Sequence, residues 1–166
     1  MKSLLSTLCL CLLVSAGLFA QKKSKKQEKQ FRQMLETTVD FEKPSEAFTK
    51  MVSQDGYQEL ATEAKIVAMY LPVDYQEVLE DFQDAKENDD RVTGSGEVSY
   101  GNTTGYYNQI SIPAPADSDK ENFTGIIAIV PVKGGTINVS ALCPDSLADE
   151  YIPLYLKSIG TVAVKK

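Results

Sequence analysis

Apolar and polar positions alternate most regularly over residues 123–144, where two runs rich in β-branched side chains flank Gly134 and Gly135. This pattern predicts a β-hairpin, because glycine readily adopts the backbone angles of a tight turn. If Val132 faces Ile137, every facing pair on that side is apolar, so that side belongs to the core. We expect the core face to contain Ile126, Ala128, Val130, Val139, Ala141 and Cys143.

The opposite face of this hairpin is apolar only at the end far from the turn, where Ile127, Ile129 and Leu142 lie. Nearer the turn the same face carries Asn138 and Thr136. The pattern predicts that another element covers only the apolar half. Our candidate for this cover is the last helix of the chain.

Pro131 restricts the loop of the hairpin, since proline has no N–H to donate. A two-residue turn at Gly134 and Gly135 would place Pro131 opposite Asn138 in a hydrogen-bonded pair. A wider loop over residues 133–136 avoids this conflict and keeps the same facing pairs. We therefore expect the wider loop, and no third strand paired with the far side of Pro131.

The clearest helix in the pattern spans residues 74–86. Its apolar stripe has helical spacing, and Asp74 is placed to cap it, with Glu77 completing a capping box. Its outer face is acidic, which a bound cation or a basic partner could explain; we favour a solvated face whose repulsion salt screens. The stripe is Tyr75, Val78, Leu79 and Phe82, and the acidic face is Glu77, Glu80, Asp81, Asp84 and Glu87.

Weaker patterns place the remaining elements. We expect a short strand at 37–41, a helix from Pro44 to just before Gly56, and a buried strand at 65–71, while the polar lead-in from Tyr57 stays open between strand and helix. A second hairpin follows, with strands 92–100 and 105–112 around a loop at 101–104. A polar connection occupies 113–122. A closing helix that starts at Glu150 places Pro153 in its first turn, and residues 161–164 end the chain as a strand.

Composition then sets the class of the protein. The chain has 166 residues, no His, no Trp and a formal net charge of −6, which suits one domain. Residues 1–20 have the pattern of a secretory signal peptide, with cleavage expected after Ala20, or alternatively after Ala16. A retained membrane anchor is the rival interpretation, although polar residues dilute the apolar run. After cleavage only Cys143 remains, so disulfides cannot stabilise the domain. We expect a periplasmic or secreted protein.

Charge is distributed unevenly along the chain. Residues 21–33 form a basic segment, whereas from Met34 onward 10 Lys and Arg stand against 22 Asp and Glu. We interpret 21–33 as a solvated tether and 34–166 as a single α+β domain. The alternative is an arm that contacts anionic membranes through Lys22, Lys23, Lys25 and Lys26. The acidic domain disfavours nucleic acid as a partner.

The sequence contains few candidates for catalytic, metal-binding or ligand-binding residues. Without His, the commonest general base and His-dependent nucleophile pairs are excluded. Cys143 is expected to be a packed thiol, and no pair of carboxylates is set apart by an apolar environment. We predict no cofactor and no catalytic residue. A partial calcium-loop pattern makes Asp117, Asp119 and Glu121 candidate metal ligands, and the tyrosines of one loop region form a candidate binding surface: Tyr100, Tyr106 and Tyr107.

Three Asn-x-Ser/Thr sequons bear on the origin of the protein. An exported chain without disulfides suits a bacterial envelope, whereas N-glycosylation sites would suit a eukaryotic secretory pathway. Such short patterns arise often by chance, so both origins stay open. The sequons are at Asn102, Asn122 and Asn138.

The order of elements from Lys65 to Gly160 resembles the PsbP-like α/β/α sandwich, shared by the extrinsic photosystem II subunit and by bacterial envelope proteins of the DcrB type. The ending carries the closest likeness: a strand closing on Leu142-Cys143-Pro144, then a helix that contains Tyr151 and Pro153. The resemblance implies a single antiparallel sheet flanked by helices, in a non-catalytic accessory or binding protein. It carries over no site residue.

Three functions follow as expectations. The first is an exported, non-catalytic domain that binds an envelope protein or a small ligand. The second is a carboxylate-dependent hydrolase, which would need two acids facing each other in a cleft. The third is a structural module held at a membrane surface by its basic N-terminal arm.

Overall fold

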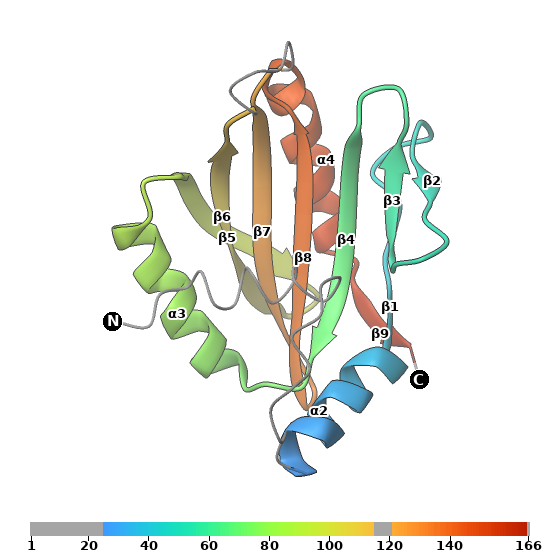
Figure 1. Ribbon diagram of the computed structural model, residues 1–166, viewed down its shortest axis with the longest axis vertical. Coiled ribbons are helices and arrows are strands. Elements are labelled where there is room, and N and C mark those ends of the chain that lie inside the picture. Colours follow the sequence, from blue (N-terminus) through green and yellow to red (C-terminus); the bar gives the residue numbers. More distant parts are fainter. Residues whose placement is uncertain (1–24, 115–120, 166) are drawn as a thin grey trace.

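A seven-stranded antiparallel sheet forms the centre of the computed structural model, which describes residues 25–114 and 121–165 (Figure 1). Its strand order is β2-β3-β4-β8-β7-β6-β5. A separate two-stranded sheet pairs β1 with β9. The strands are β1 Thr38–Asp40, β2 Thr49–Lys50, β3 Gly56–Glu59, β4 Ala64–Leu71, β5 Val92–Tyr100, β6 Thr103–Ile112, β7 Phe123–Val132, β8 Gly135–Pro144 and β9 Ala163–Lys165.

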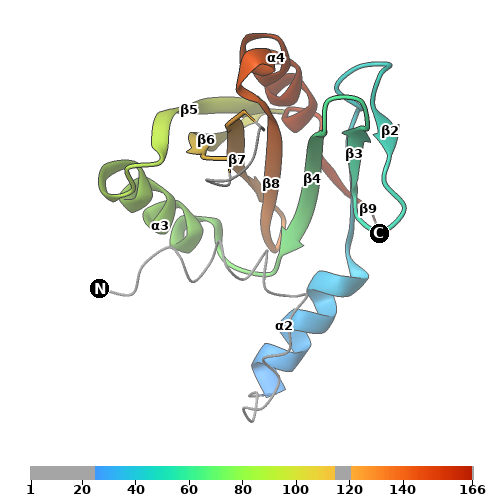
Figure 2. The ribbon, with the colours of Figure 1, turned by 45° about the horizontal axis from the view of Figure 1, so that its top comes forward.

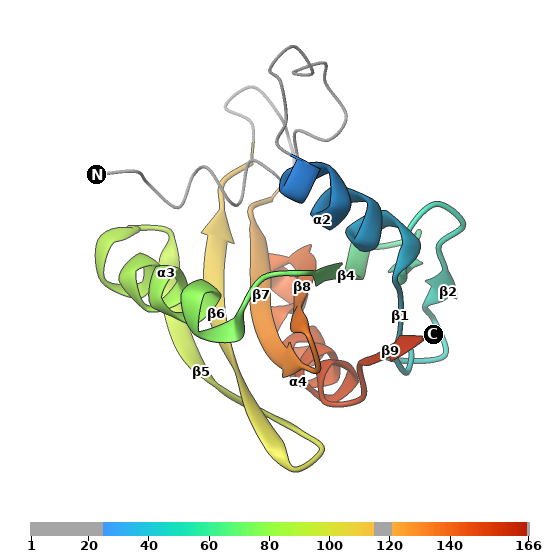
Figure 3. The same cartoon turned by 90° about the horizontal axis from the view of Figure 1, so that it is seen from below.

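Helices lie on both faces of the central sheet. Helix α3 (Tyr75–Asn88) covers one face and α4 (Ala148–Ile159) the other, as the view from below shows (Figure 3). Helix α2 (Lys25–Glu36) lies across one end of β4 (Figures 1 and 2). Among the described residues no helix has the length and apolar character needed to span a bilayer. The predicted α+β class, a sheet flanked by helices, is confirmed.

The β7–β8 hairpin forms as predicted, but its register differs by two residues. Val132 pairs with Gly135 and not with Ile137, so the two-residue turn consists of Lys133 and Gly134. Gly134 has a φ of +87°, which glycine adopts without steric cost. Gly135 is the first residue of β8. It must be glycine, because a Cβ there would lie 2.3 Å from the carbonyl oxygen of Leu71 in β4. The wider loop was therefore wrong.

The faces of this hairpin were nevertheless assigned correctly, because a shift of two residues leaves each side chain on its own side of the sheet. The prediction from Pro131 is also confirmed. Pro131 pairs with Thr136 in β8, and on its other side the ladder with β6 ends at Ile129, paired with Tyr106. No described strand thus requires an N–H from Pro131.

The larger core lies between the sheet and α4. The predicted core face is buried there, with Ile126 1% and Val139 0% exposed. Tyr155 and Ile159 of α4 pack on it, as do side chains of β1 and the segment leading into β9. The hydroxyl of Tyr155 donates a 2.8 Å hydrogen bond to the carbonyl oxygen of Leu142, which holds the helix on the end of β8.

A smaller core lies under α3 on the other face. Phe82 packs there against Ile127 and Ile129, which are 8% and 0% exposed. The cover over these isoleucines is therefore α3, and assigning it to the closing helix was wrong. Both helices have apolar stripes of similar width, so periodicity alone could not decide which one lies on which face.

The segment after β1 contains no helix, contrary to the prediction for residues 44–55. A turn leads to β2, whose two residues pair with β3, so this segment extends the edge of the sheet. Phe48 is buried against Tyr151 and Tyr155, whereas Val52 is fully exposed. The long-range contact of Phe48 with α4 prevailed over a weak helical pattern.

Helix α3 starts where its capping residue predicts, whereas α4 starts two residues before the predicted position. Asp74 caps α3 as predicted, accepting a 2.9 Å hydrogen bond from the backbone N–H of Gln76. Helix α4 begins at Ala148, directly after the 3-10 turn η1 (Asp145–Leu147), and not at Glu150. Pro153 consequently lies inside the helix, beyond its first turn.

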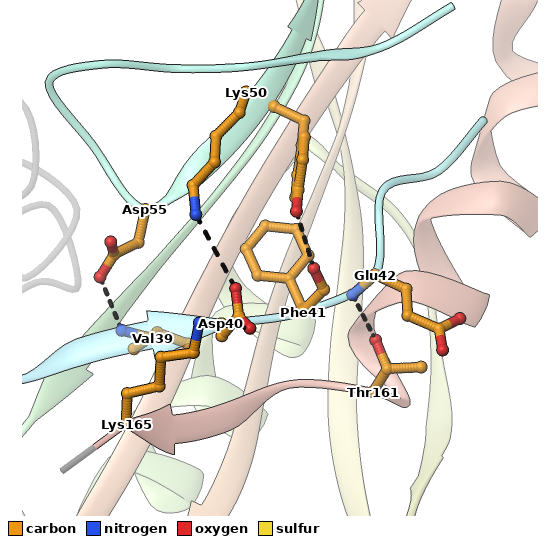
Figure 4. A network of polar contacts seen from close by, with 9 residues as sticks. Val39, Asp40, Phe41, Glu42, Lys50, Asp55, Thr161 and Lys165 are labelled. Atoms are coloured by element: carbon orange, nitrogen blue, oxygen red, sulfur yellow. Dashed lines mark hydrogen bonds and ion pairs between the residues drawn. The ribbon is translucent and has the colours of Figure 1, made fainter. Parts of the chain in front are cut away.

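A polar network joins β1 and β9 to the edge of the main sheet (Figure 4). Asp40 accepts from Lys165 at 2.7 Å, and Lys50 lies 3.9 Å away on its other side. The hydrogen bond and charge of Lys165 lower the pKa of Asp40. Asp55 accepts a 2.6 Å hydrogen bond from the backbone N–H of Val39. The first and last strands are thus held to each other and to β2 and β3.

Candidate functional site

An open cavity of about 420 Å³ lies at the end of the sheet where β7 starts and β8 finishes. This end of the sheet is at the top of Figure 1. The register explains the position of the cavity. Phe123 pairs with Pro144, and Lys65 pairs with Leu142, so the β3–β4 turn lies beside the end of the β7–β8 pair. The cavity is lined by Ala61, Thr62, Glu63, Glu121, Phe123, Pro144 and Leu147.

The lining combines apolar and acidic groups. Phe123 and Leu147 are each half-buried and leave apolar surface toward the cavity, while Glu121 is exposed. Leu60, in the same turn as the lining residues, is 77% exposed.

Glu59 connects the turn to helix α4. Its carboxylate accepts hydrogen bonds from the hydroxyl of Tyr151 and, at 3.2 Å, from the hydroxyl of Thr62. Burial, with the hydrogen bond to Glu59, raises the pKa of Tyr151, so this phenol stays protonated and donates. The contact fixes the β3–β4 turn against the start of α4, which pre-forms this side of the cavity.

Two carboxylates hold the opposite side. Glu121 accepts hydrogen bonds from both the backbone N–H and the hydroxyl of Ser146, at 2.8 and 2.9 Å. Asp145 accepts from the hydroxyl of Thr124 at 2.6 Å. The start of β7 and the residues just before it are thus joined to η1 by three charge-assisted hydrogen bonds.

Backbone strain is found at the rim. Glu63 is the non-glycine residue with positive φ, +61°, among those described. For a residue with a Cβ this conformation is uncommon and carries a cost. Such outliers gather at binding and active sites, where the surroundings enforce them.

Cys143 lies beside this region but faces the core. It is 0% exposed, and its thiol approaches the carbonyl oxygen of Thr124 at 3.8 Å. Burial, with the nearby charges of Asp145 and Glu121, raises the pKa of Cys143 to about 11. The thiol is therefore protonated near neutral pH and a poor nucleophile, as expected for a packed cysteine.

The three tyrosines predicted to form one surface are divided between the two faces of the sheet. Tyr106 packs beside the α3 core, where its hydroxyl donates to Glu97 at 3.1 Å. Tyr100 and Tyr107 pack beside the larger core under α4. Tyr106 and Tyr107 are neighbours in one strand and so point to opposite sides. The structure does not bring the three together.

The predicted metal ligands are only partly described. Asp117 and Asp119 lie outside the described residues, so a calcium loop there stays a prediction. Glu121 is described, and both of its oxygens accept from Ser146. Within 25–114 and 121–165, no group of three or more Cys, Asp or Glu side chains is arranged to hold a metal ion.

The basic segment also lies partly outside the description, which excludes Lys22 and Lys23 and the side chains of Lys25 and Lys26. Helix α2 crosses the predicted boundary at residue 34. It contacts the body through Gln30, whose amide donates to the carbonyl oxygen of Pro72 at 3.3 Å, and Gln33, whose amide donates to the hydroxyl of Tyr70 at 3.2 Å. The predicted signal peptide and its predicted cleavage site fall outside the described residues.

The sequons differ in their surroundings. Asn102 is exposed in the β5–β6 turn, whereas Asn138 lies in β8 and is paired on both sides with β4 and β7. Asn122 accepts a hydrogen bond from the backbone N–H of Ala114 at 3.0 Å.

The cavity-lining residues were not found from the sequence, except Glu121. Residues 60–63 form a short turn of mixed composition, and Phe123 and Leu147 look like ordinary core positions in the pattern. Only the pairing of β4, β8 and β7 brings residues 60–63 close to Phe123 and Leu147. No local sequence signal encodes that proximity.

Taken with the sheet order and the two covering helices, this arrangement defines an α/β/α sandwich with a cavity at one end. Among solved structures, LpqN of Mycobacterium tuberculosis, a protein involved in cell envelope biogenesis, aligns with a TM-score of 0.51 at 12% identity, over 78% of this chain and 84% of that chain. Cyanobacterial PsbP (CyanoP) from Synechocystis sp. PCC 6803 aligns with a TM-score of 0.48 at 8% identity, over 77% and 93%. The α/β/α sandwich that the resemblance implied is confirmed by the sheet and its covering helices, and at these identities the likeness to solved structures concerns the fold alone.

Comparison with protein-family models and with curated proteins found no match for this chain.

Proposed function

We propose that this protein is an exported, non-catalytic domain of the cell envelope that binds a partner protein through the cavity at the end of its sheet. The observation that carries the proposal is the cavity itself: apolar side chains line it, Leu60 is exposed beside it, and the contact of Tyr151 with Glu59 holds its rim. Protein-binding surfaces combine an apolar centre with a polar rim in this way.

Export and an envelope location are supported by the signal-peptide pattern of residues 1–20 and by the fold shared with LpqN, which acts in envelope biogenesis. A fold accommodates many functions, so the likeness supplies a direction and no site. A small ligand in the same open cavity is the second form of this proposal.

The carboxylate-dependent hydrolase is less well supported by the geometry. General acid–base work by two carboxylates needs environments that separate their pKa values. Glu59 and Glu121, on the two sides of the cavity, both accept hydrogen bonds from neighbouring hydroxyls and serve to join elements. The membrane-surface module depends on Lys22, Lys23, Lys25 and Lys26, whose side chains are not described, and it stays an alternative.

Site-specific photo-crosslinking in living cells of the source organism tests the proposal. A benzophenone amino acid at Leu60 should capture one discrete partner, whereas the same group at Val52, fully exposed on another loop, should not. Filling the cavity with Ala61→Trp should remove the product from Leu60. Equal products from both positions, or none from Leu60, would contradict the proposal.

A further inference from the structure

We infer that the cavity selects a partner segment in which an arginine or lysine side chain stands between apolar side chains. This inference rests on the proposed function and names the chemistry of its partner. It follows from two properties of the same site, the apolar lining and the sign of the charge around it.

Acidic side chains predominate among the described residues around the cavity. The segments 59–64, 121–124 and 143–150 build this end of the sheet and contain six Asp and Glu, and Lys65, the next residue of β4, is the described cation nearest to them along the chain. Carboxylates of one sign around a low-dielectric cleft focus the field and attract a cation. The six are Glu59, Glu63, Glu121, Asp145, Asp149 and Glu150.

Two of these carboxylates, Glu121 and Asp145, are held in place by neutral donors. Glu121 accepts from Ser146, and Asp145 accepts from the hydroxyl of Thr124. A carboxylate has about four lone-pair sites, so both groups keep acceptor capacity for an incoming guanidinium or ammonium.

The apolar lining of the cavity favours a partner that presents apolar side chains together with its cationic side chain. Phe123 and Leu147 line the cavity, and Leu60 is exposed beside it. Their burial by a partner contributes roughly 25 cal/mol per Å² of apolar area, whereas an exposed ion pair alone contributes little. Affinity therefore comes from apolar contact, and the carboxylates supply selectivity for the sign of charge.

Peptide titration followed by NMR tests this inference on the folded domain. The probes are acetyl-Leu-Arg-Leu-amide and its matched neutral and acidic versions with Gln or Glu in the middle. We expect shift changes at Ala61, Thr62 and Phe123, and an affinity for the Arg peptide about three- to fivefold above that for the Gln peptide at low salt. The difference should shrink at high salt, because screening weakens exposed charge pairs.

Two double variants separate local from overall charge. Glu121→Gln with Asp145→Asn keeps one acceptor oxygen at each position, for Ser146 and for Thr124, and it should reduce the affinity for the Arg peptide to that for the Gln peptide. Glu77→Gln with Glu80→Gln removes the same charge from the exposed face of α3 and should leave the preference intact. A thermal melt confirms that both variants are folded.

Several outcomes would overturn the inference. These are equal affinities for the Arg and Gln peptides, an equal loss in both double variants, or no shift at the cavity. Shifts at the cavity that depend on protein concentration without peptide would identify a second copy of the chain as the occupant. A cross-link from Leu60 that persists in the Glu121→Gln, Asp145→Asn variant would overturn the charge selection and leave the proposed function standing.

Discussion

The hydroxyl of Tyr70 donates a 2.7 Å hydrogen bond to the carbonyl oxygen of Gly134, so the end of β4 holds the turn of the β7–β8 hairpin. The same hydroxyl accepts a 3.2 Å hydrogen bond from the side-chain amide of Gln33 in α2. One side chain therefore joins three segments that are far apart in the sequence. Helix α2 is connected to the central hairpin through this phenol.

Tyr70→Phe should destabilise the domain by about 1–2 kcal/mol, because the carbonyl oxygen of Gly134 loses its donor and Gln33 loses its acceptor. Urea unfolding measures the change in free energy. Tyr106→Phe is the matched control, since that hydroxyl contacts Glu97 at an exposed position, and its effect should be clearly smaller. Equal effects of the two substitutions would contradict the assigned role of Tyr70.

Gly135→Ala should destabilise the domain by about 3 kcal/mol or more, through a steric clash. The added Cβ would lie 2.3 Å from the carbonyl oxygen of Leu71 and 2.8 Å from the ring of Tyr70, and the backbone atom cannot move without breaking the β4–β8 ladder.

Gly94→Ala provides the control for Gly135→Ala. A Cβ at Gly94, also in a strand, meets nothing nearer than 3.7 Å, so this substitution should change the free energy of unfolding by less than about 1 kcal/mol. A soluble Gly135→Ala variant with the melting temperature of the parent would show that the close approach of β4 to β8 is wrong.

The stability of the domain should fall as the pH rises from about 9 to 11, in part through Cys143. Burial raises its pKa to about 11 in the folded state, whereas an unfolded cysteine has a pKa near 8.5. The unfolded chain therefore loses its proton first. The stability contributed by this group is complete below about pH 8.5 and falls progressively as the pH rises to about 11. Buried Tyr155, whose pKa is also raised, acts in the same direction at higher pH.

Urea midpoints at pH 7, 9 and 10.5 measure this dependence, and Cys143→Ala provides the comparison. The substitution should flatten the curve between pH 8.5 and 10.5, while its cost at pH 7 reflects lost packing. Iodoacetamide should modify the parent thiol slowly at pH 8 and rapidly in urea. Rapid modification of the folded protein would show that the thiol is accessible.

Local patterns predicted those elements whose own residues contain the information. The stripe of Tyr75, Val78, Leu79 and Phe82 placed α3, with Asp74 at its cap, because helix periodicity and capping act within a few residues. The core face that contains Ile126 and Val139 was assigned correctly, since side chains alternate along a strand whatever its partner.

Long-range contacts decided what these patterns could not. The register of the β7–β8 hairpin depends on the approach of Leu71 to Gly135 from β4, 64 residues earlier in the chain. Phe48 lies between a turn and β2, and not in a helix, because it packs against the rings of Tyr151 and Tyr155. Neither partner is visible from a local window of sequence.

The sequence by itself determined an α+β domain with two hairpins, a capped amphipathic helix and an apolar sheet face, because each depends on the spacing of neighbouring residues. Only the tertiary structure decided that α3 covers Ile127 and Ile129, and that Ala61, Phe123 and Leu147 meet at one cavity. Those relationships depend on which strands pair. Pairing is fixed by the packing of the whole core, to which no single segment contributes enough free energy to determine its partner.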